Sequence, residues 1–116
     1  MVQFAPRLDR SFAALSDPTR RGILERLGRG DASISDLAAA FAMTLTGLKK
    51  HVQILEEAEL VTTEKVGRVR TCRLGRRGLE HETAWITRHS QMVEARLDRL
   101  GAFLERESEK KKGKRS

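Results

Sequence analysis

The sequence predicts a mainly α (α+β) fold, and three observations support this prediction. Apolar residues recur at helical spacing in four segments before residue 60. Residues 60–74 are rich in β-branched side chains and contain a Gly-Arg pair suited to a tight turn. From residue 86 onwards, apolar residues repeat every seven positions. In this order, the elements make a winged helix-turn-helix domain with a two-stranded wing and a long C-terminal helix.

The first three helices are expected near residues 8–15, 18–27 and 33–41. Asp17 is expected to cap the second helix, because its carboxylate can accept hydrogen bonds from unpaired backbone amides, and Pro18 suits the first helical position. Either Ser33 or Ser35 is expected to cap the third. The apolar residues expected on the inner faces of these helices are Leu8, Phe12, Leu15, Ile23, Leu24, Leu27, Ile34, Leu37 and Phe41.

A fourth helix is expected from its cap at Thr44 to about Glu59. Its apolar stripe at helical period consists of Leu45, Leu48, Val52 and Leu55. The opposite face consists of Thr46, Gly47, Lys50 and Gln53, with Lys49 at its border. This face suits the major groove of DNA, because Lys can reach guanine, Gln can pair with adenine and the Thr methyl can contact thymine. Taken alone, the helix leaves open that this is an ordinary solvated face.

The segment after this helix predicts a β-hairpin, with Val61–Val66 and Val69–Leu74 as strands and Gly67-Arg68 as the turn. The basic residues of the hairpin are Lys65, Arg68, Arg70 and Arg73. A wing of this kind lies against the phosphate backbone or enters the minor groove. Arg68, at the tip, is the strongest candidate for such a contact, and a solvated turn charge is the alternative.

A long helix is expected from about residue 78 to residue 107. Its seven-residue repeat, with Ser90 as the polar position, is typical of a helix that packs against another helix. We therefore expect this helix and the first one to form a two-fold dimer interface; the alternative is a helix folded back over its own domain. The residues expected at this interface are Leu8, Phe12, Ile86, Val93, Leu97, Leu100 and Leu104.

Composition favours an anionic partner, nucleic acid first and an anionic membrane surface second, because the net charge is +7. The partner we expect is double-stranded DNA. Residues 1–104 are expected to form the domain and its dimerisation helices, and residues 108–116 a disordered basic tail. Five positive charges between Lys110 and Arg115 leave only +2 for the rest, so a nonspecific nucleic-acid binder that depends on the tail is an alternative. A protein-interaction module on the same scaffold is another, although Lys49 and Lys50 argue against it.

A cytoplasmic protein without a membrane partner is expected. No apolar run approaches the roughly 18 residues of a membrane span, and the N-terminal residues do not resemble a signal peptide. Cys72 is the sole cysteine, so an intrachain disulfide is excluded and a reducing compartment is favoured. Cys72 is expected to be a small apolar core residue.

The chain resembles the ArsR/SmtB family of bacterial winged-helix repressors across about residues 8–104. The matching motifs are Leu15-Ser16-Asp17-Pro18-Thr19-Arg20-Arg21, Met43-Thr44-Leu45-Thr46-Gly47-Leu48-Lys49-Lys50-His51-Val52, Leu60-Val61, Gly67-Arg68 and Leu74. The resemblance implies a homodimeric, sequence-specific repressor that binds an inverted-repeat operator. It implies DNA contacts from Thr46, Gly47, Lys49 and Lys50.

Two further residues of these motifs have two interpretations each. The resemblance implies that His51 contacts a phosphate or a base, or that it is a partly buried support of its helix. Arg20 contacts a phosphate or pairs with a carboxylate of its own domain. The full set of candidate DNA-binding residues is Thr44, Thr46, Gly47, Lys49, Lys50, His51, Gln53, Lys65, Arg68, Arg70 and Arg20.

The sequence departs from the family at its metal sites. Many members have a Cys-x-Cys pair entering the third helix, where this chain has Ser33-Ile34-Ser35, and hydroxyls are poor ligands for soft metals. The last helix offers His81, Glu82, His89 and Glu94, but the two histidines are eight residues apart, which is more than two turns. No metal site and no cofactor are therefore expected; the alternative is a metal site shared between the last helices of a dimer.

Two expectations complete the sequence analysis. The remaining histidines and carboxylates are expected on helix surfaces and no nucleophile-and-base pair is present in a telling position, so no catalytic site and no enzyme are predicted. An effector, if one exists, would be an unknown small molecule or a protein. Glu59 stands where the family usually has glycine, at the end of the fourth helix.

Overall fold

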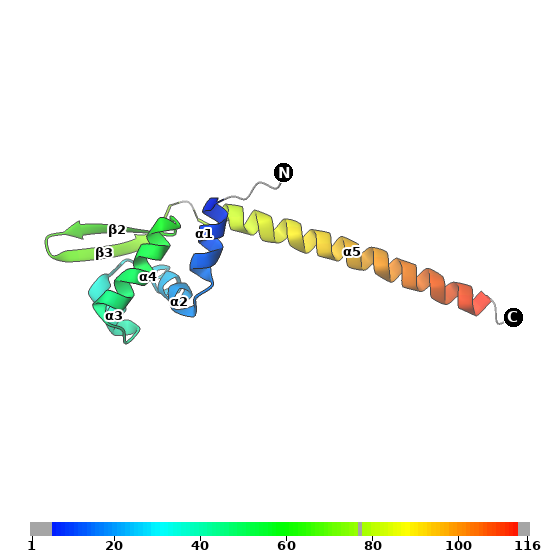
Figure 1. The fold of residues 1–116 in the computed structure, drawn as a ribbon, viewed down its shortest axis with the longest axis horizontal. Coiled ribbons are helices and arrows are strands. Elements are labelled where there is room, and N and C mark those ends of the chain that lie inside the picture. The colour runs from blue at the N-terminus through cyan, green and yellow to red at the C-terminus, as the bar shows by residue number, and fades with distance from the viewer. Residues whose placement is uncertain (1–5, 77, 114–116) are drawn as a thin grey trace. The chain divides into compact units, whose positions relative to one another are not determined.

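The computed structural model describes residues 6–76 and 78–113, which form two compact units that divide after Glu82. Their elements, labelled in Figure 1, are α1 (Pro6–Leu15), α2 (Pro18–Leu27), β1 (Ala32–Ser33), α3 (Ile34–Ala40), α4 (Leu45–Glu57), β2 (Val61–Val66), β3 (Val69–Leu74) and α5 (Glu80–Gly113). The order confirms the predicted winged helix-turn-helix with a long C-terminal helix.

Three polar side chains set the starts of the helices, as predicted. Asp17, Ser33 and Thr44 are the N-caps of α2, α3 and α4. Each side chain accepts a hydrogen bond from the backbone N–H three residues further on, at 3.1, 3.0 and 3.1 Å. Ser33, rather than Ser35, is therefore the cap of α3.

The C-terminal ends of α3 and α4 are both closed by a residue in the left-handed conformation. Ala42 has φ 51° and Glu59 has φ 63°. At each end the N–H groups of this residue and of the one after it bind carbonyls of the last turn, for example from Leu60 to Leu55 at 2.9 Å. Glu59 thus adopts the conformation for which glycine is the usual residue, and α4 is not lengthened beyond Glu57.

The sheet has three strands in the order β1-β3-β2, whereas the sequence predicted only two. The two-residue strand β1 pairs with β3 in antiparallel register, with Ala32 opposite Cys72. Strands β2 and β3 form the hairpin, with Val66 opposite Val69 around the predicted turn. β1 was missed because two residues are too short to show an alternating pattern.

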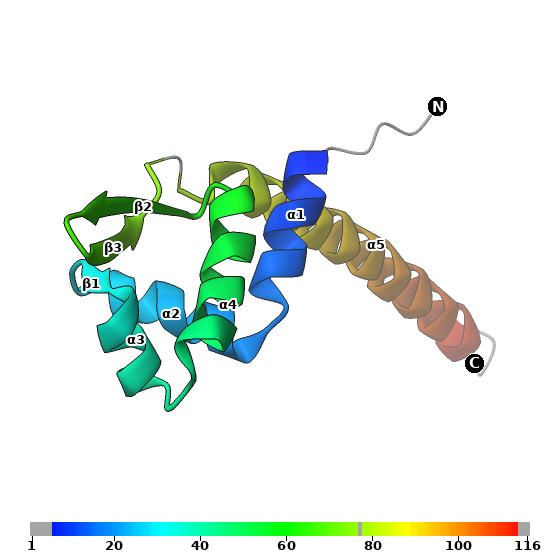
Figure 2. The same ribbon diagram turned by 60° about the vertical axis from the view of Figure 1, so that its left-hand side comes forward.

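Helix α4 crosses the middle of the first unit, with α1 on one side and β2 on the other (Figure 2). Its residues Leu48, Val52 and Leu55 are almost fully buried. Leu45, which we had included in the same stripe, is 48% exposed. It is the first residue of α4. The other core residues are Ala14, Ile23, Leu27, Ala32, Ile34, Leu37, Ala38, Ala58, Leu60, Val61 and Cys72.

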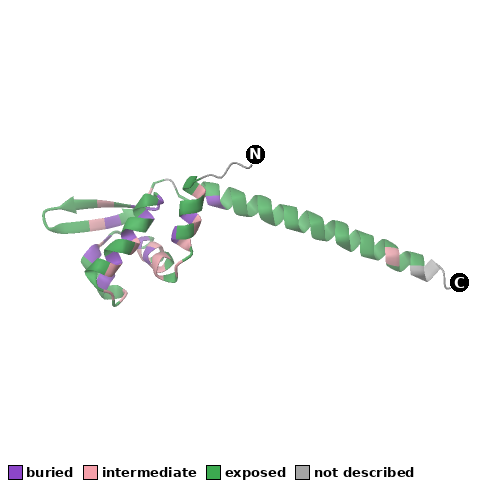
Figure 3. Ribbon diagram, viewed as in Figure 1, coloured by how far each residue is buried: buried purple, intermediate pink, exposed green. Residues whose placement is uncertain are grey.

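Helix α5 exposes nearly all of its described side chains (Figure 3). It begins at Glu80 and continues to Gly113. The tail that we expected to be disordered from residue 108 is therefore helical from residue 108 to Gly113. Residues 114–116 lie outside the described residues. Within the described chain, no helix has both the length and the apolar character that a membrane span requires.

Candidate nucleic-acid interface

The two faces of α4 differ sharply in burial. Burial of Leu48, Val52 and Leu55 fixes the rotation of the helix and leaves the opposite face towards solvent. Thr46, Lys49, Lys50 and Gln53, which we call the polar face of α4, are exposed. Within the described residues, no ion pair neutralises Lys49 or Lys50. Gln53 donates a hydrogen bond to Glu57 at 3.3 Å, so it would have to exchange this partner to bind a base.

Gly47, in the first turn of α4, lies close to the side chain of the N-cap residue Thr44. The Thr44 hydroxyl accepts from the Gly47 N–H, and a Cβ at Gly47 would lie only 3.2 Å from that hydroxyl oxygen. Glycine therefore fits the space beside the cap. Because the helix N-terminus has a partial positive charge and unpaired N–H groups, this end of α4 suits an approaching phosphate.

Arg20 is already engaged inside its own unit. Its guanidinium donates hydrogen bonds to the carbonyl oxygens of Ala14 at 2.8 Å and Ala13 at 3.1 Å, at the end of α1. A third bond joins its Nη1 to Nδ1 of His51 at 3.2 Å. A contact of Arg20 or His51 with DNA remains a prediction. The hydrogen bonds from Arg20 to the carbonyls of α1 were not predicted from the sequence.

Asp17 lies next to this pair. Its carboxylate oxygen is 3.9 Å from Nδ1 of His51, and the side chains of the two residues are 31% and 21% exposed. The pKa of Asp17 is lowered from its ordinary value, chiefly because the carboxylate accepts a hydrogen bond from the backbone N–H of Arg20, although burial opposes this effect. The carboxylate therefore stays ionised as the cap of α2.

The wing contains two kinds of basic residue. Lys65 and Arg68 are exposed, and no described carboxylate forms an ion pair with either of them. Gly67 supplies the positive φ of 63° that the turn before Arg68 requires. Arg73, in contrast, lies 3.2 Å from Glu64 and 3.7 Å from Asp31. The side chains of Lys65 and Arg68 are therefore available to bind an anion.

A hydrogen-bonded chain fastens the wing to α4. Arg70 donates to the Thr63 hydroxyl at 3.0 Å, and that hydroxyl donates to Glu56 at 3.1 Å. Sequence reasoning missed Thr63 and Glu56, because the pairing depends on how the hairpin packs against α4. Arg70, which we listed as a DNA contact, is held within this chain.

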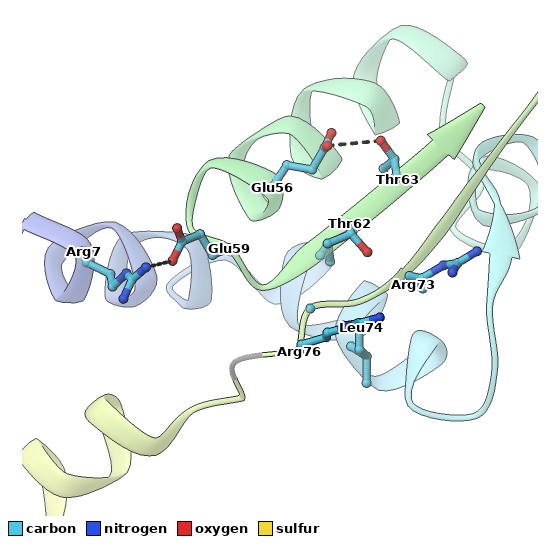
Figure 4. Close-up of a pocket in the computed structure, with 10 residues that line it drawn as sticks. Arg7, Glu56, Glu59, Thr62, Thr63, Arg73, Leu74 and Arg76 are labelled. Atoms are coloured by element: carbon cyan, nitrogen blue, oxygen red, sulfur yellow. Dashed lines mark hydrogen bonds and ion pairs between the residues drawn. The ribbon is translucent and has the colours of Figure 1, made fainter.

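The opposite end of α4 is acidic. Glu56 and Glu59 line an open groove of about 700 Å³ at the base of the wing, together with Arg7 and Arg73 (Figure 4). Arg7 forms an ion pair with Glu59. Arg76 also lines the groove, so three basic and two acidic side chains lie there together. The two carboxylates offset most of the positive charge, which weakens the attraction for a phosphate backbone.

The residues predicted for dimerisation fall into two groups. Leu8 and Phe12 on α1 are partly buried. On α5, the predicted residues form what we call the apolar seam, and each is at least 43% exposed. The members of the seam are Ile86, Val93, Leu97, Leu100 and Leu104.

The His and Glu residues of the last helix, which we weighed as metal ligands, do not form a described group. Among the described residues, no group of three or more His, Cys, Asp or Glu side chains could hold a metal ion. His89 stacks on Trp85, with ring centroids 5.3 Å apart. Glu82, which we expected on the helix surface, is instead 2% exposed.

Cys72 is fully buried in β3, as predicted for a small core residue. Burial raises the pKa of its thiol to about 11, with a further contribution from the charge of Glu56. The reactive thiolate is therefore scarce at neutral pH, which does not suit a redox sensor.

Comparison with known proteins places this geometry in a class. Residues 15–64 match a family model described as a helix-turn-helix domain. The transcriptional repressor SdpR of Bacillus subtilis is 39% identical over 56 residues, which make up 48% of this chain and 62% of that protein. The HTH-type transcriptional regulator Rv2034 of Mycobacterium tuberculosis is 30% identical over 98 residues, covering 78% of this chain and 92% of the relative. The class is that of winged helix-turn-helix transcriptional regulators, which are not enzymes.

A solved structure identifies the family within this class. An ArsR-like transcriptional regulator from Rhodococcus sp. RHA1 superposes with a TM-score of 0.75 at 34% identity, over 85% of this chain and 91% of that one. The chain belongs to the ArsR family of winged helix-turn-helix regulators.

Proposed function

We propose that the protein is a homodimeric, sequence-specific DNA-binding repressor that inserts α4 into the major groove of an inverted-repeat operator. The observation that supports this most directly is the polar face of α4, which burial of Leu48, Val52 and Leu55 directs outward. Lys50 would pair with guanine, Gln53 with adenine and Thr46 with a thymine methyl. Lys65 and Arg68 would bind the flanking phosphates and position the domain on the duplex.

The apolar seam of α5 supports the dimer. Its residues are exposed on one helix face at coiled-coil spacing, and a second copy would cover them. A two-fold dimer would present two copies of α4 to successive major grooves, roughly 34–36 Å apart. Repression is inferred from the similarity to SdpR, which is itself a transcriptional repressor.

We also propose that this regulator is cytoplasmic and does not respond to metal. Ser33 caps α3 through its hydroxyl, at the position where metal-responsive relatives would need a thiolate. The described histidines of α5 do not form a ligand group with neighbouring acids.

The test starts with selection of the tightest duplex from a random-sequence pool. Fluorescence anisotropy would then compare binding to this duplex and to a scrambled duplex of equal length, at two salt concentrations. A sequence-specific regulator is expected to bind the selected duplex at least about 10³-fold more tightly. Equal, steeply salt-dependent binding to both would contradict the proposal and indicate a nonspecific binder.

A matched pair of variants locates the specificity. Lys50→Ala is expected to weaken discrimination at one base pair by about 1–3 kcal/mol. Lys110→Ala removes the same charge from α5, where Lys110 lies 4.0 Å from Glu107, and is expected to leave discrimination unchanged. An equal loss of affinity for the selected and the scrambled duplex would indicate that Lys50 contacts only phosphate.

A further inference from the structure

Arg20 lies where three helices of the first unit meet. It belongs to the first turn of α2, its guanidinium binds the carbonyls of Ala13 and Ala14 in the last turn of α1, and its Nη1 reaches His51 of α4. The last carbonyls of a helix have no partner within that helix, and Arg20 helps to cap α1 together with Ser16 and Arg21, which bind the carbonyls of Ala13 and Leu15. A planar guanidinium can make these three bonds at once because its donors point in fixed, different directions.

His51 completes the junction from the side of α4. Since Arg20 only donates, Nδ1 of His51 accepts, which requires the neutral ring with its proton on Nε2. The His51 ring is mostly buried and lies between Arg20 and Asp17. The carboxylate of Asp17 in turn accepts a hydrogen bond from the backbone N–H of Arg20. His51 is also the immediate neighbour of Lys50, so a shift of the helix at His51 moves the polar face with it.

We propose that Arg20 is a positioning residue for DNA recognition: through His51 it sets the rotation of α4 against α1 and α2, and it does not touch DNA. This inference rests on the proposed function of α4. Buried apolar contacts alone hold a helix on one face but permit small rotations, whereas directed hydrogen bonds select one orientation. Because base-edge contacts depend on geometry more than phosphate contacts do, loss of this link should reduce specificity first.

Arg21 provides a matched control. It is the next residue of α2, has the same charge, and donates to the Leu15 carbonyl at 2.7 Å, with no hydrogen bond to α4 among the described contacts. Arg20→Gln and Arg21→Gln therefore remove equal charge from adjacent positions and each disturbs the end of α1. Only Arg20→Gln breaks the link to His51.

The experiment measures binding of the full-length variants to the selected and scrambled duplexes over a series of salt concentrations. Arg20→Gln is expected to lower the ratio of the two affinities about tenfold, with an unchanged salt slope. Arg21→Gln should leave both quantities unchanged. His51→Ala should lower the ratio as Arg20→Gln does, and the double variant should be no worse than either single one, because both act through one link.

Each outcome decides between distinct explanations. A shallower salt slope for Arg20→Gln would mean that Arg20 binds phosphate, and an unchanged ratio in a folded but less stable variant would mean that it only supports the fold; either overturns the inference. If circular dichroism shows that Arg20→Gln is unfolded, Arg20→Lys replaces it: this variant keeps the charge but cannot bind Ala13, Ala14 and His51 at once, so the ratio should still fall, and an unchanged ratio would overturn the inference. Wild-type protein that fails to discriminate between the duplexes would instead contradict the proposed function.

Discussion

Replacement of Arg68 tests how the wing contributes to binding. Arg68 is exposed beside the turn of the hairpin and has no carboxylate partner among the described residues. Its charge is therefore available to a DNA phosphate without the loss of an existing interaction. Arg68→Ala is expected to weaken binding to every duplex and to flatten its dependence on salt, because fewer counterions are released.

The magnitude follows from the number of contacts. Each neutralised phosphate contributes about 0.9 to the slope of log affinity against log salt, and the proposed dimer has two copies of Arg68, so the slope should fall by about 1.8. Between about 50 mM and about 200 mM salt, the wild-type protein should then lose about 12-fold more affinity than the variant loses. Anisotropy titrations at four or more salt concentrations give both slopes.

Arg73→Ala is the control for this prediction. It removes the same charge from the same hairpin, but Arg73 lies between Glu64 and Asp31 and is already compensated. Its slope should stay near that of the wild type. If Arg68→Ala and Arg73→Ala change the slope equally, the wing acts only through its overall charge, and the argument from the unpaired tip is refuted.

Three further predictions concern assembly and stability. Leu97→Asp should convert the dimer to monomer in sedimentation experiments, whereas Ala95→Asp, on the other side of α5, should not; dimers of both would contradict a role for the seam. The Glu59→Gly variant should have a free energy of unfolding about 1 kcal/mol higher than that of Glu59→Ala. Both variants lose the ion pair with Arg7, but only alanine keeps the strain of a side chain in the left-handed conformation. Equal free energies of unfolding in urea denaturation would refute this. The pKa of Cys72 is about 11 in the folded chain against an ordinary 9.0, so the unfolded state alone loses its proton as pH rises from 9. Stability relative to Cys72→Ala should then fall by about 2 kcal/mol by pH 11, and a constant difference would refute the shift.

Local signals made much of the fold predictable from sequence. Asp17 and Thr44 identified helix starts, because an N-cap requires only a side chain and the amide three residues on. The turn at Gly67 was equally local. The polar face of α4 followed from helical period once Leu48 and Val52 were assigned to the core.

The contacts that the sequence did not predict join different helices and strands, whether these lie near or far apart in the chain. Strand β1 exists because Ala32 reaches β3 forty residues later in the chain. The bonds from Arg20 to α1 carbonyls depend on the angle at which two helices meet, which no residue pattern encodes. Leu45 matched the apolar period but lies exposed, because period indicates direction around a helix and not whether a neighbour is present at that height.

The division of charge along α4 limits where the helix can read DNA. Its first half exposes Lys49 and Lys50, beside the positive end of the helix dipole. Its acidic end is used within the domain, since Glu56 holds the wing through Thr63 and the adjoining Glu59 pairs with Arg7 of α1. These carboxylates would repel a duplex lying along the whole helix, so the groove should receive α4 from its N-terminus to Gln53 and not the acidic turn beyond it. The same carboxylates then hold the wing and α1 in place while the exposed lysines meet the bases.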